Sequence, residues 1–223
     1  MKLFKPSFLR SGAAAVTSAL SIAVLALFTI TGLGACAPLL FSGAAVGVLM
    51  STDRRTSGSQ IEDEGIELRS ASRIRDGLVD RAHVNIASYN RQVLLTGEVP
   101  TAEDKQRVEQ IVSRVDNVRA VVNELAVMGN TSLTQRSSDA LVTAKVKASM
   151  VDAKDLFANA FKVVTERGTT YLMGRVSQRE ADRATEIARG TSGVQKVVRI
   201  FETVSDEELK NLLPTTARGD AKK

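Results

Sequence analysis

The 223-residue sequence contains one histidine, one cysteine and no tryptophan, and only 4% of its residues are aromatic. One cysteine cannot form a disulfide within the chain, and His83 has no second histidine or free thiol as a partner for metal binding or nucleophilic catalysis. With so few aromatic rings, stacking platforms for bases or sugars are not expected. No phosphate loop, nucleophile elbow or metal-ligand spacing is present. We therefore expect no enzyme, no metal and no cofactor, and a solvated surface position for His83.

The formal net charge of +5 overstates how basic the working part of the chain is. The first 35 residues hold three of the 30 basic residues and none of the 25 acidic ones, which leaves 27 against 25, or +2, for the rest. A domain that binds nucleic acid usually carries a much stronger basic excess. We expect no nucleic-acid partner.

The amino-terminal 35 residues have the pattern of an export signal, and a cysteine follows them. Lys2, Lys5 and Arg10 precede the uncharged apolar residues 13–33, as a secretory leader requires. The sequence Leu33-Gly34-Ala35-Cys36 resembles a bacterial lipobox. This resemblance implies cleavage before Cys36, a diacylglyceryl group on its thiol and an acylated amino terminus, as in palmitate-bearing lipoproteins. An uncleaved membrane-spanning helix is the alternative, because the apolar run is just long enough to cross a bilayer.

Beyond a polar stretch at residues 51–60, which we interpret as a solvated tether, the chain contains an internal repeat. Gly97-Glu98-Val99 matches Gly174-Arg175-Val176 at an offset of 77, and the strands before them match at the same offset. The preceding helices match at 72, through Ile74 with Val146 and Leu78 with Met150. This alignment predicts five extra residues in the loop of the second copy.

Each copy has the pattern helix, strand, strand, helix, strand. Alternating apolar residues and the turn pairs Asn90-Arg91 and Arg167-Gly168 predict two hairpins. Thr101 and Ser177 are expected to cap the following helices, with Glu180 completing a capping box. A glycine inside each return strand, Gly97 and Gly174, indicates a close approach by a packed helix. The expected fold class is α+β, with a three-stranded sheet and two helices on one face of it in each copy.

This element order after a lipobox resembles the BON domain family of bacterial envelope proteins, and in particular its outer-membrane lipoproteins with two BON domains. The marks are the residues from Asp53 to Gln60, the paired Gly-x-Val signatures and Tyr171-Leu172-Met173-Gly174. The expected division is a signal peptide at 1–35, lipidated Cys36 and a membrane-proximal linker at 36–62, BON domains at 63–128 and 138–205, a linker at 129–137 and a flexible tail at 206–223. Domains this small bury little surface, so we expect the two copies to pack together.

The resemblance implies attachment to the outer membrane, facing the periplasm, and Ala37 after the cysteine agrees because the aspartate that commonly retains lipoproteins in the inner membrane is absent. It also implies a role in barrier integrity under envelope stress and phospholipid binding by the second BON domain. A scaffold that contacts outer-membrane assembly or division machinery is the alternative function. Cation binding, known for soluble relatives with one BON domain, has no dense carboxylate constellation to support it here.

The residues that we expect to contact lipid lie on the first helix of the second copy. At the offset of 72, Arg69, Ser72 and Asp76 of the first copy correspond to apolar residues of the second, and lysines flank these apolar residues. Such a strip suits a helix that lies in a headgroup layer of anionic phospholipid. The alternative is that the strip packs against the first copy. The predicted lipid-binding residues are Leu141, Ala144, Lys145, Lys147, Ala148 and Val151.

Overall fold

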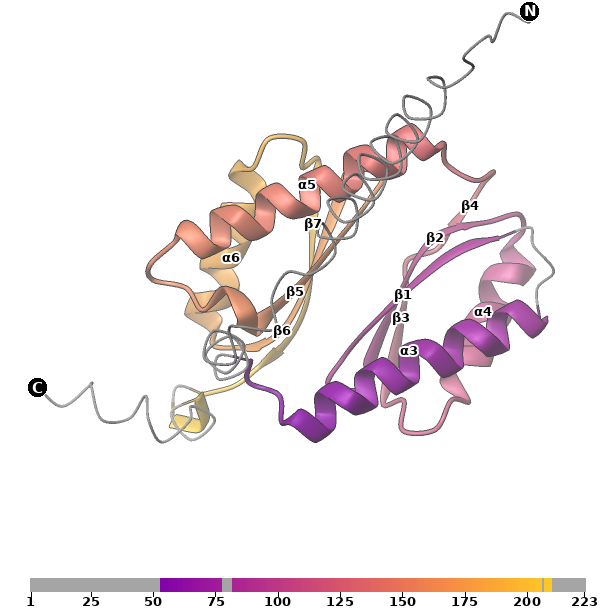
Figure 1. The fold of residues 1–223 in the computed structure, drawn as a ribbon, viewed down its shortest axis with the longest axis horizontal. Coiled ribbons are helices and arrows are strands. Elements are labelled where there is room, and N and C mark those ends of the chain that lie inside the picture. Colours follow the sequence, from indigo (N-terminus) through magenta and orange to yellow (C-terminus); the bar gives the residue numbers. More distant parts are fainter. Residues whose placement is uncertain (1–52, 78–81, 206, 210–223) are drawn as a thin grey trace, which may run out of the picture. The chain divides into compact units, whose positions relative to one another are not determined.

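The structure, a computed structural model, describes residues 53–77, 82–205 and 207–209 (Figure 1). The leader, Cys36 and most of the predicted tail lie outside the described residues. Among the described helices, none combines the length and the apolar character that crossing a bilayer requires.

The first copy is an α+β unit in which two helices pack on one face of a sheet (Figure 1). Strands β1 and β2 form an antiparallel hairpin, and the short strands β3 and β4 follow one another along β2 in parallel. The apolar core between helices and sheet includes Ile66, Leu95 and Val108. In chain order the elements are α3 (Ser57–Gly77), β1 (His83–Tyr89), β2 (Gln92–Val99), α4 (Ala102–Ser113), β3 (Ala120–Asn123) and β4 (Ala126–Val127).

The second copy repeats this order, with one continuous strand in the place of β3 and β4. Its three strands have the order β5-β6-β7, with an antiparallel hairpin and a parallel third strand. Val146 and Leu172 lie in the core between this sheet and its helices. The α+β fold class that the sequence predicted is confirmed. The elements are α5 (Leu133–Asp152), the 3-10 turn η2 (Ala158–Ala160), β5 (Phe161–Glu166), β6 (Thr169–Val176), α6 (Gln178–Gly190) and β7 (Lys196–Thr203).

The predicted hairpins and caps are present. Asn90 and Arg91 have φ of 50° and 65°, and Arg167 and Gly168 have 49° and 71°, as two-residue hairpin turns with two left-handed positions require. The Thr101 hydroxyl accepts the amide of Asp104. Ser177 and Glu180 form a complete capping box, which satisfies amides at the start of α6 that lack a partner within the helix.

The strand glycines have a different role from the predicted one. An added Cβ would lie 2.0 Å from the carbonyl oxygen of His83 at Gly97, and 2.7 Å from that of Ala160 at Gly174. The close neighbour is therefore the backbone at or just before the paired strand, and not one of the α-helices packed on the sheet. Gly97 also has φ of 110°, a conformation that side chains with a Cβ rarely adopt.

Both first helices begin earlier than expected. Thr56 accepts the amide of Ser59 at 3.1 Å as α3 starts, and Ser132 accepts that of Gln135 at 3.2 Å as α5 starts. These starts fall inside the stretches 36–62 and 129–137 that were expected to be linkers. Serine and threonine occur in linkers, but they are also preferred helix caps, so composition alone did not distinguish the two.

The two copies share an apolar cluster, as expected for domains of this size. It joins Ala87, Tyr89 and Leu94 of the first sheet to Tyr171, Met173 and Ile200 of the second. The buried hydroxyl of Tyr89 donates to the carbonyl of Ala160 at 3.1 Å, and burial raises the pKa of Tyr89 to about 12. We call this contact between the copies the seam. Its apolar part consists of sheet residues, and α3 adds an ion pair between Glu67 and Lys162 of β5. The exposed residues on the outer faces of α3 and α5 are not part of it.

Candidate membrane-binding face

The buried stripe of α5 fixes which side of this helix faces solvent. Asp139, Val142, Val146 and Met150 are buried at spacings of three and four residues, which is the period of a helix with one face on a core. The three apolar members pack against β5, β6 and α6 through the core of the second copy. The opposite side of α5 is therefore free to contact something else.

All six predicted lipid-binding residues lie on that solvent side and are exposed. Leu141 is 57% exposed and Val151 is 67% exposed, although apolar side chains of this size are usually buried. We call Leu141, Ala144, Ala148 and Val151 the α5 strip. It does not pack against the first copy, so the alternative that the sequence analysis left open does not describe this structure.

Lys145 and Lys147 border the α5 strip on its two sides. At 100° per residue, each lies about 80° around the helix from the line through Ala144 and Ala148. Within the part of the chain that the structure describes, neither lysine takes part in an ion pair. Their charges are therefore available to an anionic surface.

One further exposed apolar residue of α5 extends this surface, and the sequence analysis did not include it. Leu133, in the first turn, is 77% exposed, and its helical angle equals that of Val151 to within a few degrees. Phe157, five residues after the helix ends, is 44% exposed, but the guanidinium of Arg54 lies 5.5 Å from its ring centroid, so we do not assign it to this surface. Polar residues precede Leu133, so no apolar run in the sequence pointed to it.

The comparison of the two copies that led to the α5 strip used the wrong helical register. Asp63 accepts the amides of Asn90 and Arg91, both at 2.8 Å, and Asp139 accepts those of Arg167 and Gly168, at 2.9 and 3.0 Å. The two aspartates are thus equivalent, at an offset of 76. Ile66 then corresponds to Val142, and Ile74 to Met150. The loop of the second copy gains one residue relative to the strands, and not five.

In the corrected register, the two outer faces differ less than predicted. Leu141 corresponds to Gly65, and Ala144 to Leu68, which is itself 72% exposed. Only Ala148, opposite Ser72, and Val151, opposite Arg75, are apolar where the first copy is polar. The predicted change of Arg69, Ser72 and Asp76 to apolar residues is therefore wrong in detail. The exposure of the α5 strip does not depend on it.

The two arginines of the predicted tether are not solvated. Arg54 is 5% exposed and donates to both carboxylate oxygens of Glu180, at 2.6 and 2.8 Å. Arg55 donates to Asp63 at 2.8 Å and lies 4.4 Å from the ring centroid of Tyr89. Residues 53–55 therefore connect the end of the tether to both copies, and we call them the strap. The tether interpretation was wrong here because Glu180 is 126 residues away in sequence.

His83 is also not a solvated surface residue. Its Nδ1 lies 3.1 Å from Oε2 of Glu98, and the two side chains are 20% and 0% exposed. Arg167 donates to the other oxygen of Glu98 at 2.9 Å. Burial opposes ionisation of Glu98, but the bonds from Thr131, Arg167 and His83 outweigh it and hold the pKa of Glu98 below its usual range.

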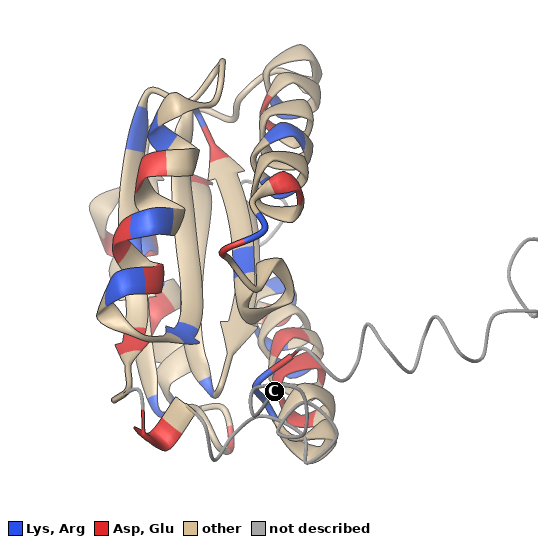
Figure 2. Cartoon of the chain, turned by 90° about the vertical axis from the view of Figure 1, so that its left-hand side faces the viewer, with Lys and Arg blue, Asp and Glu red and all other residues tan. Residues whose placement is uncertain are grey.

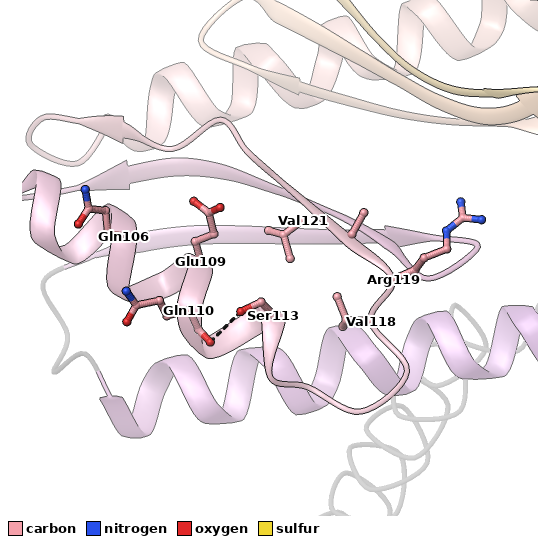
Figure 3. Close-up of a pocket in the computed structure, with 8 residues that line it drawn as sticks. Gln106, Glu109, Gln110, Ser113, Val118, Arg119 and Val121 are labelled. Atoms are coloured by element: carbon pink, nitrogen blue, oxygen red, sulfur yellow. Dashed lines mark hydrogen bonds between the residues drawn. The ribbon is translucent and has the colours of Figure 1, made fainter.

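A hollow of about 400 Å³ lies between α4 and β3 (Figure 3). Its charged lining residues are already paired: Glu109 accepts from Asn123 at 2.9 Å, and Arg119 donates to Glu202 at 3.1 Å. Ser113 donates to the carbonyl of Gln110 within the hollow. This arrangement brings no nucleophile and base together, so we assign the hollow no function.

The BON domain family model matches residues 62–129 and 138–204. Outer membrane lipoprotein DolP of Haemophilus influenzae is 36% identical over 169 residues, which cover 75% of this chain and 88% of that protein. The 21 kDa hemolysin of Actinobacillus pleuropneumoniae is 32% identical over 154 residues, which cover 68% and 79%. Among solved structures, CdsD, a structural protein of the type III secretion system of Chlamydia trachomatis, matches 69% of this chain at 14% identity, and the TM-score of 0.27 is too low to support an argument. The chain belongs to the BON domain family and has two BON domains, as a protein similar to DolP.

Proposed function

We propose that the protein is an outer-membrane lipoprotein, anchored through Cys36 and facing the periplasm, that binds anionic phospholipid through the α5 strip. We further propose that this binding helps to maintain the outer membrane under envelope stress. The observation that carries the proposal is the exposed α5 strip between two unpaired lysines. The printed name of the Haemophilus influenzae relative, an outer membrane lipoprotein, supports the location.

The expected affinity of the strip alone is modest. Each half-exposed apolar side chain contributes about 1 kcal/mol when it leaves water, and each lysine near an anionic surface adds about 1 kcal/mol. A lipid anchor at Cys36 would hold the strip at roughly millimolar effective concentration near the bilayer. Weak binding would therefore suffice for occupancy in the anchored protein.

Vesicle co-sedimentation tests the lipid contact with the unlipidated mature chain, residues 36–223 carrying Cys36→Ser. We expect binding to vesicles with anionic phospholipid and much weaker binding to zwitterionic ones. Leu141→Glu should weaken binding to anionic vesicles about tenfold or more, because it adds a negative charge and removes an apolar contact. Leu68→Glu is the matched control, since Leu68 is an exposed leucine on the equivalent helix. A folded Leu141→Glu chain that binds as the wild type does would refute the assignment.

The anchor is tested separately. Cys36 is the only cysteine, so Cys36→Ser should abolish incorporation of labelled fatty acid and leave the leader uncleaved. Label on the Cys36→Ser chain, or a mature protein that begins at another residue, would contradict the lipoprotein assignment. This result does not depend on whether α5 binds lipid.

The first copy favours the alternative function, a scaffold that contacts outer-membrane assembly or division machinery. Ile61 and Leu68 are 71% and 72% exposed on one face of α3, seven residues apart, and α3 is acidic overall. Exposed Arg75 continues this line a further seven residues along, but the acids Glu64 and Asp76 border the line on its two sides. An apolar face with an acidic border suits a protein better than an anionic bilayer. A photo-crosslinking residue at position 68 should then capture protein, and one at position 141 should capture lipid.

A further inference from the structure

Three side chains that commonly ligate metals meet at the seam, although they are far apart in sequence. His83 begins β1, Glu98 lies near the end of β2, and Glu166 ends β5. One ligand atom of each lies within 4.8 Å of the other two. Glu98 and Glu166 are buried, and His83 is partly buried. The sequence shows no metal-ligand spacing because Glu166 comes from the other copy.

The pairing of β1 with β2 prepares two of the three ligands. His83 and Glu98 are direct partners in the hairpin register, and Nδ1 lies 3.1 Å from Oε2. Neighbouring ligand atoms of a tetrahedral zinc ion are about 3.3 Å apart, given bonds of about 2.0 to 2.2 Å. This pair is therefore already close to the required separation, and only the Glu166 carboxylate has to move, by up to about 1.5 Å.

Hydrogen bonds hold the Glu98 carboxylate in place. Arg167 donates to Oε1 at 2.9 Å, and the amide and hydroxyl of Thr131 donate to Oε2, both at 3.2 Å. The guanidinium therefore occupies the oxygen that faces away from His83. Partners of this kind orient the ligands of protein metal sites, and a cation bound between Oε2 and Nδ1 would replace the contact that Oε2 makes with His83.

The charge balance of the cluster also favours a cation. Glu166 accepts a hydrogen bond from the amide of Asn85 at 2.7 Å. The buried carboxylates of Glu98 and Glu166 lie within 4.8 Å of each other, and Arg167, which donates to Glu98, can neutralise only one of the two charges. A divalent ion would remove this repulsion.

We propose that His83, Glu98 and Glu166 bind one divalent transition-metal ion of the Zn²⁺ type, with water as the fourth ligand. An imidazole with carboxylates suits such an ion, whereas Ca²⁺ needs six or more oxygen ligands and Mg²⁺ binds oxygen in an octahedron. Because His83 and Glu98 belong to the first copy and Glu166 to the second, the ion would join the two BON domains across the seam. This role is independent of lipid binding by α5.

Zn²⁺ titration of the full chain in detergent micelles tests the proposal, with the Cys36→Ser substitution to remove the only thiol. His83 is the only histidine, so an untagged chain gives little background. We expect one Zn²⁺ per chain in a competition assay with a chromophoric chelator, and an increase in melting temperature. His83→Gln and Glu166→Gln should each weaken binding at least about tenfold, since even outer-shell partners contribute about 10 to 100-fold. Glu64→Gln, at an exposed acid on α3, is the matched control.

Co²⁺ provides a readout that does not rely on variants. The wild-type chain should develop the visible absorption of a tetrahedral Co²⁺ complex with nitrogen and oxygen ligands, and excess Zn²⁺ should remove it. Absence of this absorption, or of a stoichiometric Zn²⁺ site, would overturn the proposal. Unchanged affinity in Glu166→Gln would overturn it as well, because this variant keeps an acceptor for Asn85 and should fold.

Discussion

The two BON domains share a skeleton but present different first helices to their surroundings. Helix α3 has three arginines against five carboxylates, a formal charge of −2, and α5 has three basic residues against two carboxylates, a charge of +1. Figure 2 shows basic and acidic residues interspersed over the helices in view. Core packing constrains only one stripe of each helix, so the outer stripe is free to differ. The difference between the two domains therefore lies on the outer faces of these helices.

A buried aspartate that binds the hairpin turn is common to the two copies. Asp63 and Asp139 each hold a hairpin turn by accepting two backbone amides, and both are buried inside the first half of a helix. Ser88 and Arg55 add two further bonds to Asp63, whereas Gln135 adds one to Asp139. The hydrogen bonding of this aspartate is therefore more extensive in the first copy.

The largest predicted effect on stability comes from removing either of these aspartates. Asp63→Ala should lower the free energy of unfolding by about 4 kcal/mol and Asp139→Ala by about 2 to 3 kcal/mol, because buried donors left without an acceptor cost about 1 to 3 kcal/mol each and the costs partly overlap. Urea unfolding of each variant measures the difference. A larger loss for Asp139→Ala than for Asp63→Ala would contradict our ranking of the two copies.

The sequence was sufficient to predict most of the skeleton. Asn90-Arg91 and Arg167-Gly168 were correctly predicted as turns, and Ser177 with Glu180 as a cap, because these signals lie within a few residues of each other. The register of α3 against α5 was missed because Ser70, fully buried, occupies the position of Val146. Matching apolar to apolar residues then shifted the alignment by about one turn.

What remained hidden from the sequence depends on contacts over long distances. Arg54 lies in a polar stretch typical of a tether, and its partner Glu180 lies in the second BON domain. His83 appeared isolated because Glu98 is 15 residues away and Glu166 belongs to the second copy. The α5 strip could be predicted because its residues recur at helical spacing on one element. Its lipid contact remains a prediction.

The next largest effect is expected at the strap. Arg54→Ala should cost about 3 kcal/mol, because it leaves Glu180 as a buried charge without its bidentate partner. Arg55→Ala should cost about half as much, since its side chain and that of Asp53 are each 15% exposed. Arg54→Lys should not restore stability, because a lysine cannot make two parallel bonds to a carboxylate. Thermal melts compare the three variants. Equal losses of stability for Arg54→Ala and Arg55→Ala would contradict the prediction that the bond from Arg54 to the second copy is the stronger of the two.

Acid should affect the first copy through Asp63. Burial raises the pKa of this carboxyl, but bonds from Ser88, Arg91, Arg55 and Asn90 outweigh burial and hold the pKa below its ordinary value of 3.8. A group with a lowered pKa in the folded state stabilises the fold above its unfolded pKa, and this contribution is lost as pH falls through the folded value. The free energy of unfolding should therefore decrease below about pH 4, and Asp63→Asn should show a smaller decrease. Identical pH profiles would contradict the assignment.

The smallest effect on stability is expected from changes to the outer faces, which carry the difference between the domains. Lys145→Glu with Lys147→Glu should change the free energy of unfolding by less than about 0.5 kcal/mol, because both lysines are exposed and unpaired. The same variant should lose most of its binding to anionic vesicles, and the loss should be smaller at high salt, where the wild type also binds less.

The reciprocal change tests whether charge alone accounts for the expected difference in lipid binding between α3 and α5. Glu64→Lys with Asp76→Lys brings α3 from −2 to +2 around the exposed Ile61 and Leu68, without altering its buried stripe. If a cationic border is what makes an apolar helix face bind an anionic bilayer, this variant should bind anionic vesicles more tightly than the wild type, by up to about 1 kcal/mol for each added lysine. Binding no tighter than that of the wild type would mean that the small, exposed side chains of Ala144 and Ala148 in the α5 strip matter as much as the lysines.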